Sequence, residues 1–125
     1  MNYAACVMLF NNNGEVLGVA RKNDPSKFGL PGGKVEPHET FVQAAARECK
    51  EETGLDLKNL KMIFAEEDYD GYYCVCFTAD IEQNAVINPR PGEAEVRWIP
   101  RQTLLDGPFG DYTQKVFEII DQEKV

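Results

Sequence analysis

The 125-residue chain is poor in several residue types that mark common protein classes. It has one histidine, His38, and no pair of cysteines in CxxC spacing, so a structural zinc site is not expected. No apolar run approaches the ~20 residues that a membrane-spanning helix needs. The first ten residues, MNYAACVMLF, lack the basic start of a signal peptide. We therefore expect a cytoplasmic protein without a membrane partner.

Positive charge is also scarce, with 13 lysines and arginines against 21 aspartates and glutamates, a net charge of -8. Such a chain has no overall field to attract nucleic acid or anionic lipid, and no nucleic-acid partner is expected. The length suits a single domain over residues 1–125. The four cysteines are interpreted as small core residues: Cys6, Cys49, Cys74 and Cys76.

Apolar runs separated by glycine, proline and asparagine predict alternating strands and helices. The predicted strands are 3–10, 15–21, 56–68, 72–81 and 94–100, the predicted helices are 39–53 and 111–122, and the main loops are 23–33 and 88–93. This order predicts an α/β (α+β) fold in which a mixed sheet is covered by helices on both sides.

The stretch RECKEETG, residues 47–54, places three glutamates within five positions. At ~100° per residue, Glu48, Glu51 and Glu52 fall on one arc of helix 39–53, next to its apolar side. Carboxylates this close repel one another, and those that border a packed face are costly without a partner. A divalent cation would remove that cost. The alternative is a surface helix whose acids pair with lysine and arginine.

Two glycines just ahead of this helix favour the metal-site interpretation. Gly32 and Gly33 stand in LPGGKVEPHE, residues 30–39. Glycines allow the backbone to turn sharply and to approach a ligand closely, and a carbonyl oxygen of such a loop can complete a metal's ligand shell.

The pattern from Gly33 to Leu55 resembles the box that identifies the Nudix hydrolase superfamily. The box is Gly, five residues, Glu, seven residues, Arg-Glu-aliphatic, one residue, Glu-Glu, one residue, Gly-aliphatic. The chain reads GKVEPHETFVQAAARECKEETGL and departs only at Cys49, where an aliphatic residue is usual. Seven fixed identities give a chance match on the order of one in 10⁸ per position. The resemblance implies the α/β/α sandwich of that superfamily.

The resemblance implies a site for Mg²⁺, or for Mn²⁺ in its place. The implied ligands are carboxylates of the acidic helix and one backbone carbonyl: Glu48, Glu51, Glu52 and Gly32. Members of the superfamily often add an acid from a late loop, and here Glu93 and Glu95 are the candidates, with a mild preference for Glu95.

Other positions of the box imply supporting roles. Glu39 and Arg47 resemble the ion pair that holds the acidic helix and orients Glu48. Gly33 and Gly54 resemble the structural glycines at the loop and at the end of the helix.

The implied activity is hydrolysis of a nucleoside diphosphate linked to another group. The implied catalytic set is Glu39, Arg47, Glu48, Glu51 and Glu52. A metal can bind the substrate phosphates and the attacking water, and either Glu51 or Glu52 would take the proton from that water.

Residues outside the box are expected to bind the rest of the substrate. Arg21 and Lys34 are candidates for phosphate contacts, and Phe28 is a candidate for stacking on a base. The chain is short, so a MutT-like pyrophosphohydrolase is the favoured type, cutting a nucleoside triphosphate, with an oxidised base as one option, into a monophosphate and pyrophosphate. The alternatives are hydrolysis of a dinucleoside polyphosphate, ADP-ribose or a nucleotide sugar, and a non-catalytic nucleotide-binding domain. Monomer and homodimer both stay open.

Overall fold

The computed structural model describes residues 2–68 and 70–123, which form seven strands and three helices. The strands are β1 (Asn2–Met8), β2 (Val16–Arg21), β3 (Asp24–Gly29), β4 (Gly32–Lys34), β5 (Lys58–Glu67), β6 (Tyr72–Asp80) and β7 (Val96–Ile99). The helices are α1 (Phe41–Thr53), α2 (Arg101–Leu105) and α3 (Gly110–Glu123).

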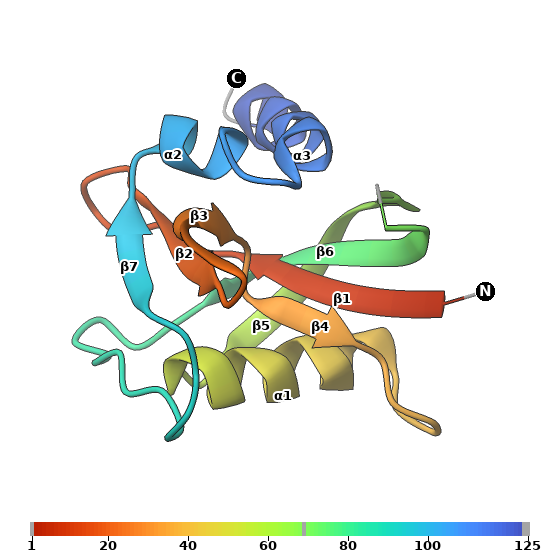
Figure 1. The fold of residues 1–125 in the computed structure, drawn as a ribbon, viewed down its shortest axis with the longest axis horizontal. Helices are drawn as coiled ribbons and strands as arrows, with labels where there is room; N and C mark the ends of the chain where they lie inside the picture. The colour runs from red at the N-terminus through yellow and green to blue at the C-terminus, as the bar shows by residue number, and fades with distance from the viewer. Residues whose placement is uncertain (1, 69, 124–125) are drawn as a thin grey trace.

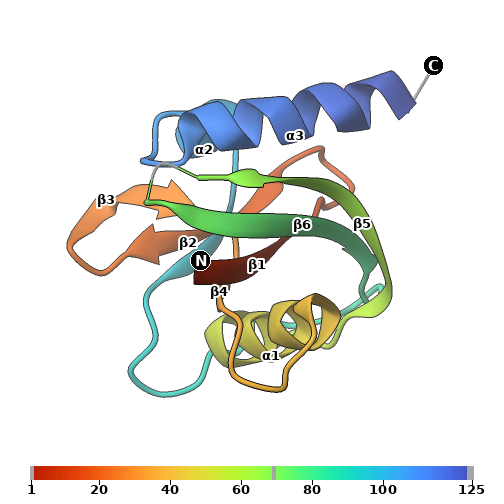
Figure 2. The same ribbon diagram turned by 90° about the vertical axis from the view of Figure 1, so that its right-hand side faces the viewer.

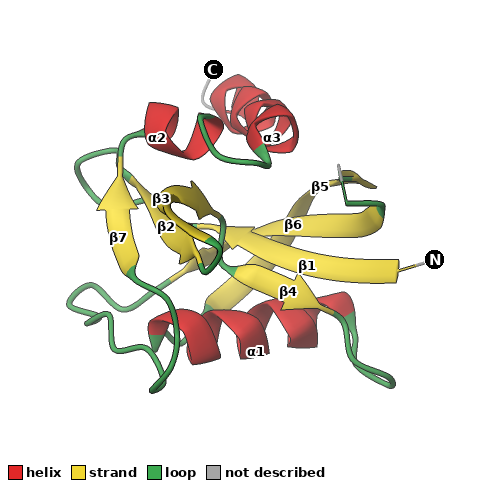
Figure 3. Ribbon diagram, viewed as in Figure 1, coloured by secondary structure: helices red, strands yellow, loops and turns green. Residues whose placement is uncertain are grey.

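The strands form two sheets that lie between α1 on one side and α2 with α3 on the other (Figure 1, Figure 3). The first sheet has the order β4-β1-β6-β5 and the second has the order β3-β2-β7. The first sheet is mixed, because β1 runs parallel to β6 and antiparallel to β4. The predicted α/β/α arrangement is confirmed, and the strands divide into two sheets.

Strand β1 is apolar on both faces because a helix layer covers each face. Ala5 and Val7 face the cluster that includes Ala45 and Cys49 of α1. Cys6 and Met8 face the cluster that includes Val116 of α3. Figure 2 shows α3 lying along one side of the first sheet and α1 on the other. The four cysteines are all buried and free, and Cys6 and Cys49 belong to opposite sides of this core.

Local signals at both ends fix helix α1. Thr40 is the N-cap and forms a capping box with Gln43. Gly54 ends the helix at φ 79°, a left-handed conformation that glycine adopts without strain. A Cβ at Gly54 would lie 2.2 Å from the carbonyl oxygen of Asn88. The helix therefore ends against the loop that carries residues 88–93.

The structure differs from the sequence prediction in residues 23–33, which were expected to be loop. They contain β3, which pairs antiparallel with β2, and the first two residues of β4, which pairs with β1. Asp24 keeps a local turn contact, since its Oδ1 accepts from the amide and the hydroxyl of Ser26, and β3 pairs with β2 through Asp24, Phe28 and Gly29. The short helix α2 was also not predicted. No helix in the described part of the chain is long and apolar enough to cross a membrane.

Candidate active site

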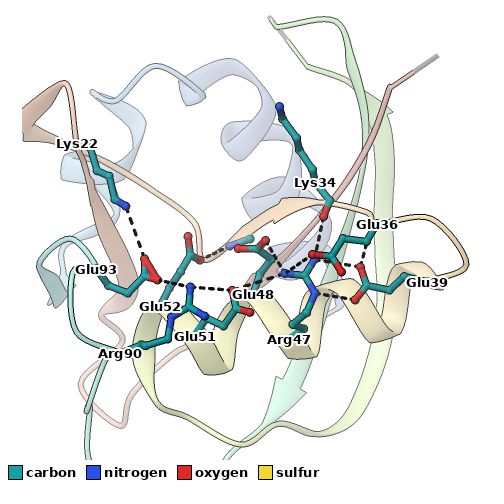
Figure 4. A network of polar contacts seen from close by, with 11 residues as sticks. Lys22, Lys34, Glu36, Glu39, Arg47, Glu48, Glu51, Glu52, Arg90 and Glu93 are labelled. Carbon is teal, nitrogen blue, oxygen red and sulfur yellow. Dashed lines mark hydrogen bonds and ion pairs between the residues drawn. The ribbon is translucent and has the colours of Figure 1, made fainter.

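Helix α1 presents its acidic side chains on the flank that faces β4 and the loop before β7 (Figure 4). Five carboxylates gather there, three from α1, one from the residue before its N-cap and one from the late loop: Glu48, Glu51, Glu52, Glu39 and Glu93. We call this set the acidic cluster. Two arginines, Lys22 and the backbone amides of Gly32 and Glu36 contact it.

Arg47 ties the first half of the acidic cluster together. Its Nε donates to Glu39 Oε2 at 2.7 Å and its Nη2 donates to Glu39 Oε1 at 3.0 Å, a two-point contact. Its Nη1 donates to Glu48 Oε1 at 2.9 Å and lies 3.6 Å from Glu51 Oε2. Nη2 also donates to the carbonyl oxygen of Lys34 at 3.0 Å. One guanidinium thus joins α1, β4 and the loop before the helix.

These contacts shift the pKa values of Arg47 and Glu39 in the directions expected for an ion pair. Hydrogen bonding from Arg47 lowers the pKa of the Glu39 carboxyl. The contact with Glu39 raises the pKa of the Arg47 guanidinium far above its ordinary value. Both groups therefore stay charged.

Glu48 lies against Gly33 of β4. A Cβ on Gly33 would come within 2.6 Å of Glu48 Cδ and 2.7 Å of Glu48 Oε1, so any side chain at this position would displace the carboxylate. Burial raises the pKa of Glu48, and the hydrogen bond from Arg47 offsets part of that rise. The second glycine of the loop therefore makes room for this acid.

Glu52 is the acid of the cluster whose ionisation is most disfavoured. Burial raises its pKa to about 8, although the amide N–H of Gly32 donates to its Oε1 at 2.8 Å and favours the charged form. The charges of Glu48, Glu93 and Glu51 add to the rise. The contact at Gly32 is made by its N–H, whereas the sequence predicted a role for its carbonyl oxygen.

The late loop contributes Glu93 to the acidic cluster and not Glu95. Glu93 has a side chain that is 13% exposed, and its Oε2 lies 3.4 Å from Arg90 Nη2. Glu95 is 58% exposed and pairs with Arg97 at 2.5 Å, so the structure does not bring the candidate preferred from the sequence into the acidic cluster. Arg90 also lies 3.5 Å from Glu51 Oε2. No sequence signal drew attention to Arg90, because its partner Glu51 is distant in the chain.

The donor chemistry of the acidic cluster fits a hard divalent cation, for which carboxylate oxygens are the preferred ligands. Among the residues that the structure describes, no three acidic, histidine or cysteine side chains converge on one point. The guanidinium of Arg47 lies between Glu48 and Glu51, and that of Arg90 lies between Glu51 and Glu93. These arginines contact the same oxygens that a cation would use.

Two cavities meet beside the acidic cluster. The first, of about 390 Å³, is lined by Glu52 and Glu93 together with Lys22. The second, of about 250 Å³, has a more apolar wall that includes Cys6, Cys74, Tyr72, Phe109, Tyr112 and Thr113. Arg21, Leu30 and Gly32 line both cavities, so the acidic site and the apolar cavity share one wall.

Two of the predicted substrate-binding cations line the apolar cavity. The guanidinium of Arg21 lies 5.0 Å from the ring centroid of Phe109, and Lys34 Nζ lies 5.6 Å from that of Tyr72. Each cation therefore stands over an aromatic wall of the cavity.

Phe28 does not reach either cavity. It is 2% exposed, belongs to the core beside β2, and is covered by Arg97 at 5.0 Å from its ring centroid. The predicted stacking of Phe28 on a base is corrected to core packing. Phe109, which follows α2, lines the apolar cavity together with Tyr72 and Tyr112.

The comparisons with known proteins agree on one protein family. The family model described as "NUDIX domain" matches residues 2–118. An ADP-ribose pyrophosphatase from Methanocaldococcus jannaschii is 42% identical over 66 residues, which are 50% of this chain and 39% of that protein. An 8-oxo-dGDP phosphatase from Mus musculus is 29% identical over 107 residues, 82% of this chain and 33% of that protein. The chain thus spans a third to two fifths of the length of these curated relatives.

A solved structure extends the similarity to nearly the whole chain. The MutT protein from Methanosarcina mazei Go1 superposes with a TM-score of 0.69 and 25% identity, covering 98% of this chain and 94% of that one.

Proposed function

Because the chain belongs to the Nudix hydrolase superfamily, we propose that it hydrolyses a phosphoanhydride bond of a nucleoside diphosphate derivative. The observation that carries the proposal is the acidic cluster, held together by Arg47 and lining one of two neighbouring cavities that share Arg21, Leu30 and Gly32. The favoured substrate is a nucleoside triphosphate, with an oxidised base included, which would yield a monophosphate and pyrophosphate.

Nudix hydrolases generally use divalent metal ions, and we assign Mg²⁺ here. Glu48, Glu51, Glu52 and Glu93 would hold it, since their oxygens lie on one flank of α1. When bound, the ion would lower the pKa of a water molecule and neutralise charge on the phosphate oxygens.

The residues of the chain would position the reacting groups and accept the proton. Arg47 fixes Glu48 through a 2.9 Å hydrogen bond, which supports its role as a positioning residue. Glu52 is the favoured proton acceptor, because its carboxyl lines the first cavity, where the phosphates and the attacking water would lie. Water would form the new bond to phosphorus, the bridging P–O bond would break, and the water proton would pass to Glu52.

The two neighbouring cavities support a nucleotide as the substrate. Phosphates next to the acidic cluster would lie in the first cavity, where Arg21 and Lys22 add positive charge. The base would enter the second cavity, whose wall carries the rings of Phe109 and Tyr72. A volume of about 250 Å³ lies below the usual range for a drug-sized ligand, which favours one base over two.

The activity test is a substrate panel with Mg²⁺ in which products are resolved by chromatography. The panel includes dGTP, 8-oxo-dGTP, 8-oxo-dGDP, ADP-ribose and a dinucleoside polyphosphate. We expect Glu52→Gln to lower kcat/KM on the best substrate by about 100-fold or more, with Glu66→Gln, an exposed acid on β5, as the unaffected control. Equal turnover by Glu52→Gln, or no product from any substrate, would contradict the proposal. Turnover of ADP-ribose alone would select the alternative that the archaeal relative's name suggests.

A further inference from the structure

Arg90 is a second cation at the acidic cluster, and it lies where the cluster opens to solvent. Its Nη2 is 3.5 Å from Glu51 Oε2 and 3.4 Å from Glu93 Oε2. It therefore bridges an acid of α1 and an acid of the late loop (Figure 4). Each contact uses a carboxylate oxygen of a residue assigned above to the divalent cation.

The backbone holds Arg90 at this position independently of its side chain. The amide of Arg90 donates to the carbonyl oxygen of Glu51 at 3.0 Å, and the amide of Asn88 donates to that of Thr53 at 2.8 Å. The amide of Glu93 in turn donates to the carbonyl oxygen of Arg90 at 3.1 Å. The loop is thus attached to the last turn of α1, and this attachment places the Cα of Arg90 beside Glu51 and Glu93.

Arg90 differs from Arg47 in how firmly its guanidinium is bound. Arg47 is 24% exposed and makes contacts as short as 2.7 Å with two-point geometry to Glu39. Arg90 is 60% exposed, and its two contacts are 3.4 and 3.5 Å long. Long contacts of an exposed guanidinium are weak, so Arg90 is the cation that can leave the cluster at small cost.

From this geometry we propose that Arg90 is a built-in competitor of the divalent cation at Glu51 and Glu93. The proposal rests on the assignment of the acidic cluster as the cation site under Proposed function. The guanidinium partly neutralises the two carboxylates, and an ion that binds them must first displace it. Arg90 thereby sets the cation concentration at which the site fills, without being a ligand itself.

Cation affinity of the purified chain tests this directly, without substrate. Isothermal titration with MnCl₂, after removal of metal by EDTA and dialysis, gives Kd for wild type and for Arg90→Gln. We expect the variant to bind Mn²⁺ roughly three- to tenfold more tightly, because two weak ion pairs no longer oppose binding. The rise in Tm on adding saturating Mn²⁺ is expected to be larger for the variant than for wild type.

Two control variants remove one positive charge each, as Arg90→Gln does. They separate direct competition by Arg90 from the effect of overall charge on Mn²⁺ affinity. Lys22→Gln removes a cation that is 73% exposed and only reaches Glu93 at 3.9 Å. Lys115→Gln removes one from α3, across the sheets, where it pairs with Glu66. Both should change Kd less than twofold.

The outcomes distinguish this inference from the proposed function. Wild type that binds Mn²⁺ with the same Kd as Arg90→Gln, or more tightly, overturns the competition and leaves the hydrolase proposal standing. If Lys22→Gln tightens Mn²⁺ binding as much as Arg90→Gln does, the competition proposal is also overturned, because the loss of one positive charge would then explain the change. A wild type that binds no Mn²⁺ removes the cation site and this inference together.

Discussion

Two glutamates of the acidic cluster respond in opposite directions to the same neighbour, Arg47. Glu39 and Glu48 both accept hydrogen bonds from Arg47. The pKa of Glu39 falls, because the hydrogen bonds dominate, whereas the pKa of Glu48 rises, because desolvation dominates. The arginine thus leaves one carboxylate as a stable counter-ion and the other in need of a further cation.

Glu52 leads to a prediction about pH at this scale. Its pKa is about 8 in the folded chain and about 4.3 in an unfolded one. Between these values the folded state binds a proton that the unfolded state does not, so the free energy of unfolding of the metal-free protein falls as pH rises. Glu52→Gln lacks that proton exchange. We expect its loss of stability from pH 5 to pH 8 to be smaller than that of wild type, by on the order of 3 kcal/mol.

Urea unfolding at pH 5 and pH 8 in the presence of EDTA measures this difference. Glu66→Gln, an exposed acid outside the cluster, serves as the control and should follow wild type. Parallel pH profiles for wild type and Glu52→Gln would show that burial does not disfavour the charge of Glu52.

At the scale of elements, α1 was predictable because its signals are local. The glutamate spacing and Gly54 fixed the acidic face and the end of the helix, and Thr40 with Gln43 caps the start. Strand β3 was not predictable, because Asp24-Pro25-Ser26 has turn chemistry and the strand is defined by its pairing with β2 through Asp24, Phe28 and Gly29. A contact between distant segments also decides between Glu93 and Glu95. Both precede β7, and the docking of loop 88–93 on α1 decides which one faces Glu52.

The junction of α1 with that loop leads to the second prediction. Gly54 combines a left-handed backbone with a Cβ position only 2.2 Å from the oxygen of Asn88. Gly14 has nearly the same φ, 78°, but nothing lies within 4 Å of its Cβ position. Gly14→Ala should cost about 1 kcal/mol of unfolding free energy from backbone strain alone. Gly54→Ala should cost at least about 2 kcal/mol more, since the loop must move.

Thermal or urea unfolding of the two variants gives the difference, and Mn²⁺ titration shows its consequence. A displaced loop carries both Glu93 and Arg90 away from α1. We expect loss of the ligand Glu93 to outweigh loss of the competing guanidinium, so Gly54→Ala should bind Mn²⁺ more weakly than Gly14→Ala. Equal stability of the two variants would mean that the loop yields to a methyl group without cost.

At the scale of the whole molecule, the candidate site is assembled from segments that the sequence does not bring together. Helix α1 supplies the carboxylates, β4 supplies the glycine that admits Glu48, and loop 88–93 supplies Glu93 and Arg90. The Nudix sequence pattern from Gly33 to Leu55 made the carboxylates of α1 and the glycine of β4 predictable together. The apolar cavity was not predictable, because its walls come from β1, β6 and the segment between α2 and α3, and these approach only through sheet pairing and helix packing.

Phe109 provides the prediction that belongs to this scale, because its ring closes the cavity from a segment distant from the acidic cluster. Phe109→Leu keeps an apolar side chain but removes the aromatic face against which Arg21 lies. If the base occupies this cavity, the variant should raise KM for the best nucleotide about three- to tenfold while kcat stays within twofold, since the carboxylates are unchanged. Phe10→Leu is the matched control, because Phe10 packs on Phe117 at another part of the core and does not line the cavity. Steady-state kinetics of wild type, Phe109→Leu and Phe10→Leu measure these changes in KM and kcat. A fall in kcat with unchanged KM would place the base elsewhere, because loss of a binding wall acts on the ground state and the transition state alike.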